Sequence, residues 1–171
     1  MGKGYLHVYT GNGKGKTTAA LGLSLRAICA GKKVFFGQFI KGMDYSELKA
    51  VELLPNFEIQ QFGRDCFIFN EPTEKDIAIA KEGLNKMGEV LVKGEYDLVV
   101  LDEINVALYF KLFSLEELLA VLKNKADHVE VICTGRYAPK ELIDLADLVT
   151  EMKEIKHYYF KGVEARVGIE K

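Results

Sequence analysis

A glycine-rich stretch near the start of the sequence constrains the fold more than any other feature. It reads YTGNGKGKTTAALG over residues 9–22, directly after a run rich in aromatic and branched residues at 5–9. Glycines let the backbone curl with its N–H groups pointing inward, and the positive end of a following helix dipole points at the same place. The order of strand, loop and helix therefore predicts a phosphate-binding site, whereas a simple glycine-rich turn is the alternative.

The spacing of this stretch differs by one residue from the usual phosphate-binding pattern, in which a glycine and four further residues precede Gly-Lys-Ser/Thr. Gly15, Lys16 and Thr17 fix the end of the loop, and the position of the first glycine is taken by Thr10. The glycine comes one residue later, at Gly11. Three interpretations follow: a damaged nucleotide site, a chance match, or a loop adapted to other chemistry.

A second motif, LVVLDE at residues 98–103, is an apolar run that ends in two acidic residues. In a parallel sheet such a strand brings a carboxylate to the open end of the phosphate loop, where it helps to hold magnesium. Thr17 is placed to offer a hydroxyl to the same ion, and Thr18 is placed to reach a phosphate oxygen. The alternative is that Asp102 and Glu103 only cap the segment that follows.

Strand-like and helix-like stretches alternate along the whole chain. The further expected strands are residues 34–40, 57–62, 97–101 and 129–133. The expected helices are residues 16–30, a long helix from Thr73, one after Ser114, and a short one from Pro139 to near Asp147. Thr73 with Asp76 and Ser114 with Glu117 are predicted to form capping boxes at the starts of the second and third of these helices. This alternation predicts an α/β fold: one domain over residues 1–171, with a mainly parallel sheet, helices on both faces, and ligands at the carboxyl ends of the strands.

Composition excludes several classes of protein. The net charge of −2 argues against binding nucleic acid by bulk electrostatics. No stretch is long and apolar enough for a signal peptide or a membrane span, so no membrane association is expected. The three cysteines, Cys29, Cys66 and Cys133, lie far apart, which fits reduced thiols in a cytoplasmic protein better than a disulfide framework.

The surroundings of the expected phosphate site lack the usual groups for cleaving a γ-phosphate. Such cleavage needs a cation over that phosphate and a residue that positions the attacking oxygen. Only Arg64 and Arg136 occur beside expected strand ends, and no histidine neighbours either motif in the sequence. The site is therefore predicted to bind a polyphosphate without an evident apparatus for transferring its terminal phosphoryl group.

Six segments together carry a family resemblance. They are TGNGKGKTTAALG, QFIKG at residues 38–42, VVLDE, TGR at 134–136, DLADLVTEM at 144–152 and KGVEARVGIEK at the end. In this order and spacing the chain resembles the ATP:corrinoid adenosyltransferases of the CobA/BtuR type, which serve cobalamin biosynthesis. The resemblance implies a P-loop, RecA-like fold and a reaction in which Co(I) of a corrinoid attacks the 5′-carbon of ATP and triphosphate leaves. Co(I) is a strong nucleophile, which explains why no protein base is evident.

The resemblance also assigns roles to particular residues. It implies that Lys16 neutralises the leaving group, that Thr17 and Glu103 bind Mg²⁺ or Mn²⁺, with Asp102 as a further candidate ligand, and that Asn12 contacts the nucleoside. Lys16, Thr17 and Glu103 are the expected catalytic residues. The expected nucleotide-binding residues are Gly11, Asn12, Gly13, Lys14, Gly15, Lys16, Thr17, Thr18 and Arg136.

For the corrinoid, the resemblance points to the stretch FGRDCFIF at residues 62–69. Relatives pack aromatic side chains against the lower face of the corrin, and the candidates here are Phe67 and then Phe69, with a place in the core as the alternative for both. The sequence departs from the Gly-Phe-Thr-Trp pattern of the best-known members and contains no tryptophan. It also begins close to its first strand, so we expect a corrin pocket without the N-terminal extension of some relatives.

The resemblance further implies a homodimer and a flavodoxin-type electron donor. Two rival functions remain on the same scaffold. One is a phosphotransferase or nucleotide hydrolase, and the other is a non-catalytic sensor of ATP or corrinoid.

Overall fold

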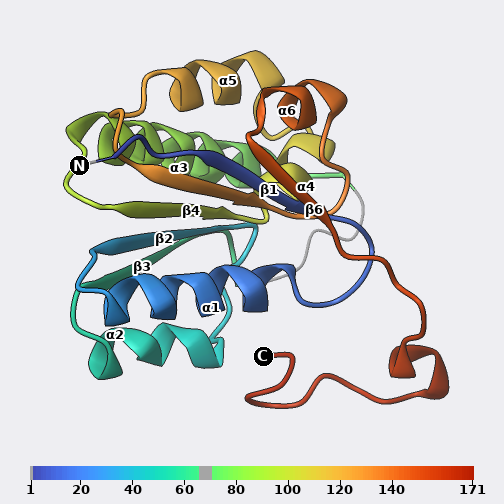
Figure 1. Ribbon diagram of the computed structural model, residues 1–171. Helices are drawn as coiled ribbons and strands as arrows, with labels where there is room; N and C mark the ends of the chain where they lie inside the picture. Colours follow the sequence, from blue (N-terminus) through green and yellow to red (C-terminus); the bar gives the residue numbers. More distant parts are fainter. Residues whose placement is uncertain (1, 66–70) are drawn as a thin grey trace.

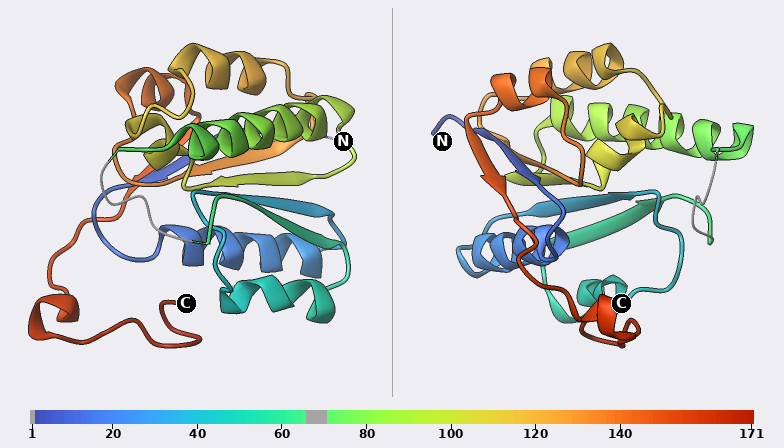
Figure 2. Two further views of the ribbon diagram at one scale, coloured as in Figure 1. Left: turned by 180° about the vertical axis from the view of Figure 1, so that it is seen from behind. Right: turned by 90° about the vertical axis from the view of Figure 1, so that its right-hand side faces the viewer.

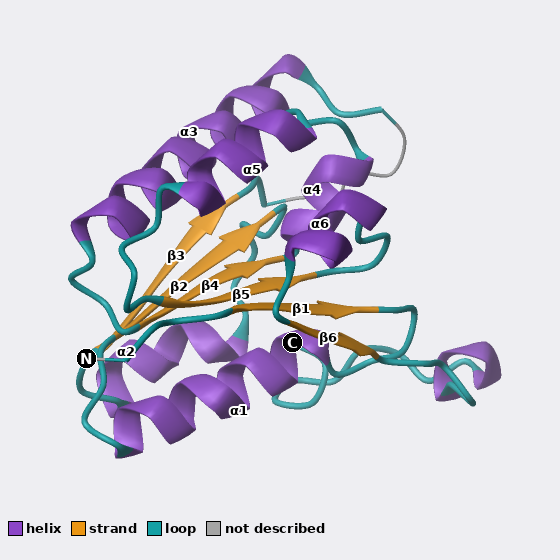
Figure 3. Cartoon of the chain, turned by 45° about the horizontal axis from the view of Figure 1, so that its top comes forward, coloured by secondary structure: helices purple, strands orange, loops and turns teal. Residues whose placement is uncertain are grey.

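The computed structural model describes residues 2–65 and 71–171, and the strands in these residues form one parallel sheet. The order across the sheet is β3-β2-β4-β5-β1-β6 (Figure 3). The strands are β1 (Leu6–Thr10), β2 (Val34–Phe39), β3 (Phe57–Phe62), β4 (Leu98–Asp102), β5 (Glu130–Thr134) and β6 (Leu148–Glu151).

Helices cover both faces of this sheet. One face carries α1 (Lys16–Cys29) and α2 (Ala50–Leu53), which follows the short 3₁₀ helix η1 (Ser46–Lys49) (Figure 1). The other face carries α3 (Glu74–Lys93), α4 (Ile104–Tyr109), α5 (Leu115–Lys123) and α6 (Lys140–Leu145). A second 3₁₀ helix, η2 (Tyr158–Lys161), lies beyond β6 in the C-terminal segment, residues 152–171, which leaves the sheet and turns back below α1 (Figure 2).

Alternation along the central strands divides the core into two layers. In β2, Phe35 and Phe39 pack toward α3, whereas Val34 and Phe36 pack toward α1. Every residue of β2 and of β4 is buried, as expected for central strands covered on both faces. This double burial is the reason that both strands read as nearly continuous apolar runs.

The register of the sheet brings the ends of four strands together. Gln38 of β2 pairs with Asp102 of β4, Leu101 of β4 pairs with Cys133 of β5, and Thr134 at the end of β5 pairs with Tyr9 of β1. The loop that follows β1 therefore lies at the same edge of the sheet as the acidic end of β4. This is the edge at which the sequence predicts ligand binding.

The predicted α/β fold with a mainly parallel sheet is confirmed, and each expected strand matches an observed one within one residue. The sequence did not indicate β6, α2 or α4. All four residues of β6 are exposed and both helices are short, so none of them produces a clear burial pattern. Among the described residues, none of the helices has the length and apolar character needed to cross a membrane.

The two predicted capping boxes are also confirmed. Thr73 caps α3 together with Asp76, and Ser114 caps α5 together with Glu117. Asp76 has a further partner, because Arg64 donates two hydrogen bonds to its carboxylate, of 2.6 and 2.8 Å. These hydrogen bonds lower the pKa of Asp76 to about 2, and their effect outweighs that of burial, which raises the pKa. The pair joins the chain just after β3 to the start of α3.

We predict that Asp76→Asn destabilises the fold by about 2 kcal/mol at pH 7, since a pKa shift of one unit corresponds to ~1.4 kcal/mol. The folded-state pKa of this carboxyl is depressed, so its contribution is present above pH 4 and is lost as the pH falls toward 2. Urea unfolding at pH 7 and near pH 2.5 measures both effects. The exposed Asp44→Asn is the matched control, and an equal loss for Asp76→Asn at both pH values would contradict the assignment.

Candidate nucleotide site

The glycine-rich loop rests against the chain that follows β6. The N–H of Gly13 donates to the carbonyl oxygen of Met152 at 2.7 Å, and the N–H of Met152 donates to Thr10 at 2.8 Å. A Cβ atom would lie 2.4 Å from the Met152 oxygen at Gly11 and 2.7 Å from it at Gly13. Both positions therefore require glycine, for a packing reason that is independent of any ligand.

The displaced first glycine has a structural explanation. Thr10 is the last residue of β1 and pairs with Glu151 of β6, and its hydroxyl accepts a hydrogen bond from the N–H of Ala138 at 3.3 Å. The strand thus continues through Thr10, and the chain turns into the left-handed region only at Gly11, with φ of 93°. The loop is intact, and its first glycine comes one residue later because β1 extends through Thr10.

Lys16 begins α1 and folds its side chain back over the loop. Its ammonium donates to the carbonyl oxygens of Gly11 and Gly13, each at 2.8 Å. Burial lowers the pKa of Lys16, an effect that Glu103 opposes and Arg136 reinforces. The ammonium is thus held inside the loop, at the place where a phosphate chain bound by the loop would need a positive charge.

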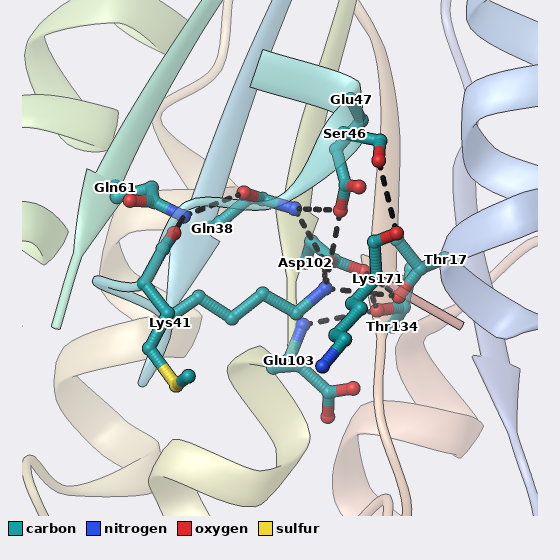
Figure 4. Close-up of polar contacts among 11 residues, drawn as sticks. Thr17, Gln38, Lys41, Ser46, Glu47, Gln61, Asp102, Glu103, Thr134 and Lys171 are labelled. Carbon is teal, nitrogen blue, oxygen red and sulfur yellow. Dashed lines mark hydrogen bonds and ion pairs between the residues drawn. The ribbon is translucent and has the colours of Figure 1, made fainter. Parts of the chain in front are cut away.

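Asp102, at the end of β4, is fully buried and collects donors from separate parts of the chain (Figure 4). The hydroxyls of Thr17 and Thr134 donate to one of its oxygens at 2.9 and 2.6 Å. Lys41 donates to the other oxygen at 2.8 Å, and Gln38 contacts that oxygen at 3.4 Å. A carboxylate has about four acceptor sites, so these contacts saturate Asp102.

Glu103 follows with its backbone in the left-handed region, at φ of 59°, and its N–H donates to the hydroxyl of Thr134 at 3.0 Å. Burial raises the pKa of Glu103, and the negative charge of neighbouring Asp102 raises it further. The side chain lines the same cavity as Thr17. A cation in this cavity would relieve the repulsion between the two carboxylates, so Thr17 and Glu103 fit the divalent ion that the sequence predicts.

A cavity of about 500 Å³ opens between the loop, η1 and the C-terminal segment. Lys14, Lys16, Lys41 and Arg136 contribute positive charge to its lining, and Thr17 and Thr18 contribute hydroxyls. The sequence predicted most of these groups but did not single out Lys41, although this residue lies in the quoted QFIKG segment. His157 also lines the cavity, a contact that the sequence does not reveal because His157 lies far from the loop along the chain.

The C-terminal segment is joined to the loop by an ionic cluster. Glu170 accepts a hydrogen bond from Lys14 at 2.9 Å and another from the guanidinium of Arg166 at 3.2 Å. Tyr158 contacts the same carboxylate and accepts a hydrogen bond from Lys14 at 3.2 Å. The cluster places residues 168–171 along the wall of the cavity and holds Lys14 against the C-terminal segment, with 39% of the Lys14 side chain still exposed.

A second cavity of about 570 Å³ adjoins the first and shares Arg136 and His157 with it. Asn12 lines this second cavity together with the aromatic rings of Tyr137, Tyr159 and Phe160. A larger cavity, of about 680 Å³, lies beside α3, α4 and α5, away from the loop, and borders Tyr109 and Tyr137, whose rings stack at 4.3 Å. The polar groups around the loop make the first cavity the candidate for a polyphosphate.

The structure thus brings the predicted loop residues, Asp102, Glu103 and Arg136 to one edge of the sheet. Phe67 and Phe69, the candidates for the corrin face, lie outside the described residues. Within residues 2–65 and 71–171, no group of three or more histidine, cysteine or acidic side chains is placed to hold a metal ion.

Comparison with known proteins gives a consistent result. The sequence profile of the family described as ATP:corrinoid adenosyltransferase BtuR/CobO/CobP matches residues 2–170. A corrinoid adenosyltransferase of Sinorhizobium sp is 36% identical over 98% of this chain and 80% of its own. Corrinoid adenosyltransferases of Escherichia coli K12 and Salmonella typhimurium, the second named CobA, are 34% and 36% identical over 98% of this chain and 86% of theirs.

The contact between the loop and Met152 leads to a prediction. Gly11→Ala is expected to weaken ATP binding at least about tenfold and to lower thermal stability, because the new methyl group meets the Met152 carbonyl and the backbone φ of 93° disfavours alanine. Gly22→Ala is the matched control, since it lies on the exposed side of α1 with nothing within 4 Å. Calorimetric titration with ATP and Mg²⁺ tests this, and a Gly11→Ala affinity within twofold of wild type would refute it.

Proposed function

Since this chain belongs to the ATP:corrinoid adenosyltransferase family, we propose that its loop between β1 and α1 holds the triphosphate of ATP while the Co(I) centre of a corrinoid attacks the 5′-carbon. The observation that carries this proposal is the cavity at the loop, which is lined by the cations of Lys16, Lys41 and Arg136 together with the hydroxyls of Thr17 and Thr18. This concentration of positive charge suits a highly charged leaving group.

The chemistry explains why the protein needs groups that bind the two substrates but no group that activates the nucleophile. The electron pair of Co(I) forms the cobalt–carbon bond, the bond from C5′ to oxygen breaks, and triphosphate leaves with the electron pair of the broken bond. No proton has to be removed from the nucleophile, so a general base has no task in this step. The protein accelerates the reaction by holding the two substrates in line and by stabilising the charge that grows on the leaving oxygen.

Within this site we assign Lys16 to the leaving triphosphate and the pair Thr17 and Glu103 to Mg²⁺ or Mn²⁺. The ion, when bound, neutralises phosphate charge. Asp102 is proposed to orient the Thr17 hydroxyl, because its own oxygens are already saturated by four donors. The loop amides, Thr18 and Arg136 complete the phosphate site.

The second cavity supports a place for the nucleoside. Asn12 and Arg136 line it beside three aromatic rings, and it shares Arg136 and His157 with the phosphate cavity. We propose that Asn12 contacts the nucleoside there. For the corrinoid we retain Phe67 and Phe69 as proposed contacts with the lower face, on the strength of the family resemblance in their stretch of sequence.

We further propose that the chain acts as a single domain in a homodimer and receives electrons from a flavodoxin-type donor. A cytoplasmic location is supported by the free thiols of Cys29 and Cys133, which suit a reducing compartment. Exposed apolar residues in the C-terminal segment, among them Ile155, Phe160 and Val167, support an interface with a second copy.

The proposed reaction predicts a specific pair of products. When cobalamin reduced to Co(I) is mixed without oxygen with the protein, ATP and Mg²⁺, we expect the spectrum of an adenosylcorrinoid and release of intact triphosphate. Visible absorption follows the cobalt, and anion-exchange chromatography identifies the phosphates. ADP and phosphate with an unchanged corrinoid would indicate a phosphotransferase or hydrolase, and ATP binding without any product would indicate a sensor.

Lys16→Ala is predicted to reduce kcat/KM for adenosyl transfer by about 100-fold or more, because it removes the charge that faces the leaving group. The variant also loses the hydrogen bonds to Gly11 and Gly13, so thermal unfolding must accompany the assay. Lys123→Ala, at an exposed position on α5, is the control for loss of a lysine. A folded Lys16→Ala variant with nearly full activity would remove Lys16 from the leaving-group site.

A further inference from the structure

Lys41 stands out because the backbone before it is strained. It follows β2, and the residue between them, Ile40, adopts a left-handed conformation with φ of 64°. This region is unfavourable for a β-branched side chain and persists only where the surroundings enforce it. Here the turn lets Lys41 reach back across the ends of the strands, with its side chain only 15% exposed.

The ammonium of Lys41 lies between groups from three different elements (Figure 4). It is 2.8 Å from Asp102, 3.4 Å from the hydroxyl of Thr17 and 3.8 Å from Glu47. Gln38 bridges the two carboxylates, with contacts of 3.0 Å to Glu47 and 3.4 Å to Asp102. Burial lowers the pKa of Lys41, but the nearby carboxylates, Asp102 foremost, raise it overall, so the group is a cation.

Two roles are compatible with this position. In the first, Lys41 only neutralises the buried charge of Asp102. In the second, it also binds the ligand of the cavity. An ammonium has three N–H groups, and only the contact with Asp102 is a short one. A second N–H donates to Thr17 at a longer 3.4 Å, and Glu47 lies 3.8 Å away. Within the described residues one N–H is thus left without a hydrogen bond at the wall of the cavity, beside Thr17 in the first turn of α1.

The position of Lys16 supports the second role. Two of its N–H groups are engaged by Gly11 and Gly13 on the loop side of the cavity. Lys41 enters the same cavity from β2, next to Thr17. A triphosphate lying along the loop would thus be contacted by one lysine from the loop and by another from the neighbouring strand end.

We infer that the Lys41 ammonium binds a phosphate oxygen of the triphosphate beside Thr17, as a second lysine of the leaving-group site. This inference rests on the proposed function, because it adds a residue to the site proposed there. The sequence directs attention to Arg64 and Arg136 as cations beside the strand ends, whereas this inference assigns a positive charge at the phosphate to Lys41. Asp102, Gln38 and Glu47 then act as positioning residues for Lys41.

The test separates ligand binding from neutralisation of Asp102. Inorganic triphosphate with Mg²⁺ is titrated calorimetrically into the full chain and into four variants: Lys41→Met, Asp102→Asn, the double variant with both changes, and Lys49→Met. The last is the matched control, at an exposed lysine of η1. Adenosine, which has no phosphate, is titrated into the same proteins, and thermal unfolding reports on folding.

If Lys41 binds the phosphate, Lys41→Met weakens triphosphate binding about tenfold or more while adenosine binding stays unchanged. The double variant, in which the buried negative charge is gone, is weaker than Asp102→Asn by a similar factor. If the double variant binds triphosphate as tightly as Asp102→Asn, or Lys41→Met as tightly as wild type, the inference is overturned. Should Lys41→Met fail to fold, the comparison of Asp102→Asn with the double variant decides alone.

The test of triphosphate binding by Lys41 does not depend on whether the proposed reaction occurs. Formation of the cobalt–carbon bond by the wild-type protein is measured separately. A wild-type protein that binds triphosphate through Lys41 but makes no adenosylcorrinoid would refute the function and leave the inference standing. If the wild-type protein forms adenosylcorrinoid but Lys41→Met binds triphosphate as tightly as wild type, only the inference is refuted.

Discussion

The site depends on one buried carboxylate. Asp102 lies at the end of the central strand β4, out of contact with solvent, and an ionised group in such a place must be compensated by donors. It receives them from α1, β5, β2 and the turn after β2, through Thr17, Thr134, Gln38 and Lys41. The carboxylate thereby fixes four segments of the sequence at one edge of the sheet, and the phosphate loop takes its place in front of them.

Much of this arrangement could be predicted because its causes are local. The capping boxes at Thr73 and Ser114, the apolar run that ends at Asp102, and the helix start at Lys16 each depend on residues a few positions apart. The alternation of strands and helices then implies a parallel sheet, and a parallel sheet places the loop and the acidic strand end at one edge. The family resemblance added the reaction, which neither the spacing nor the composition supplies.

The features that escaped prediction depend on contacts between distant residues. Strand β6 has no buried side chain to mark it, yet the chain directly after it determines why Gly11 and Gly13 must be glycine. The position of Lys41 follows from the register that pairs Gln38 with Asp102, and the contact of Lys14 with Glu170 spans almost the whole chain. The displaced glycine that sets this loop apart thus has its explanation in the length of β1 and in the support from Met152.

The central claim is that the bond broken in ATP lies between C5′ and oxygen, so the triphosphate chain leaves undivided. The most direct test replaces ATP by its β,γ-imido analogue, whose β–γ bridge resists cleavage, in an anaerobic reaction with Co(I) cobalamin. The account predicts that adenosylcobalamin still forms and that imidotriphosphate is released. A protein that forms adenosylcobalamin from ATP but none from the bound analogue, and that releases diphosphate and phosphate in place of triphosphate, would contradict it.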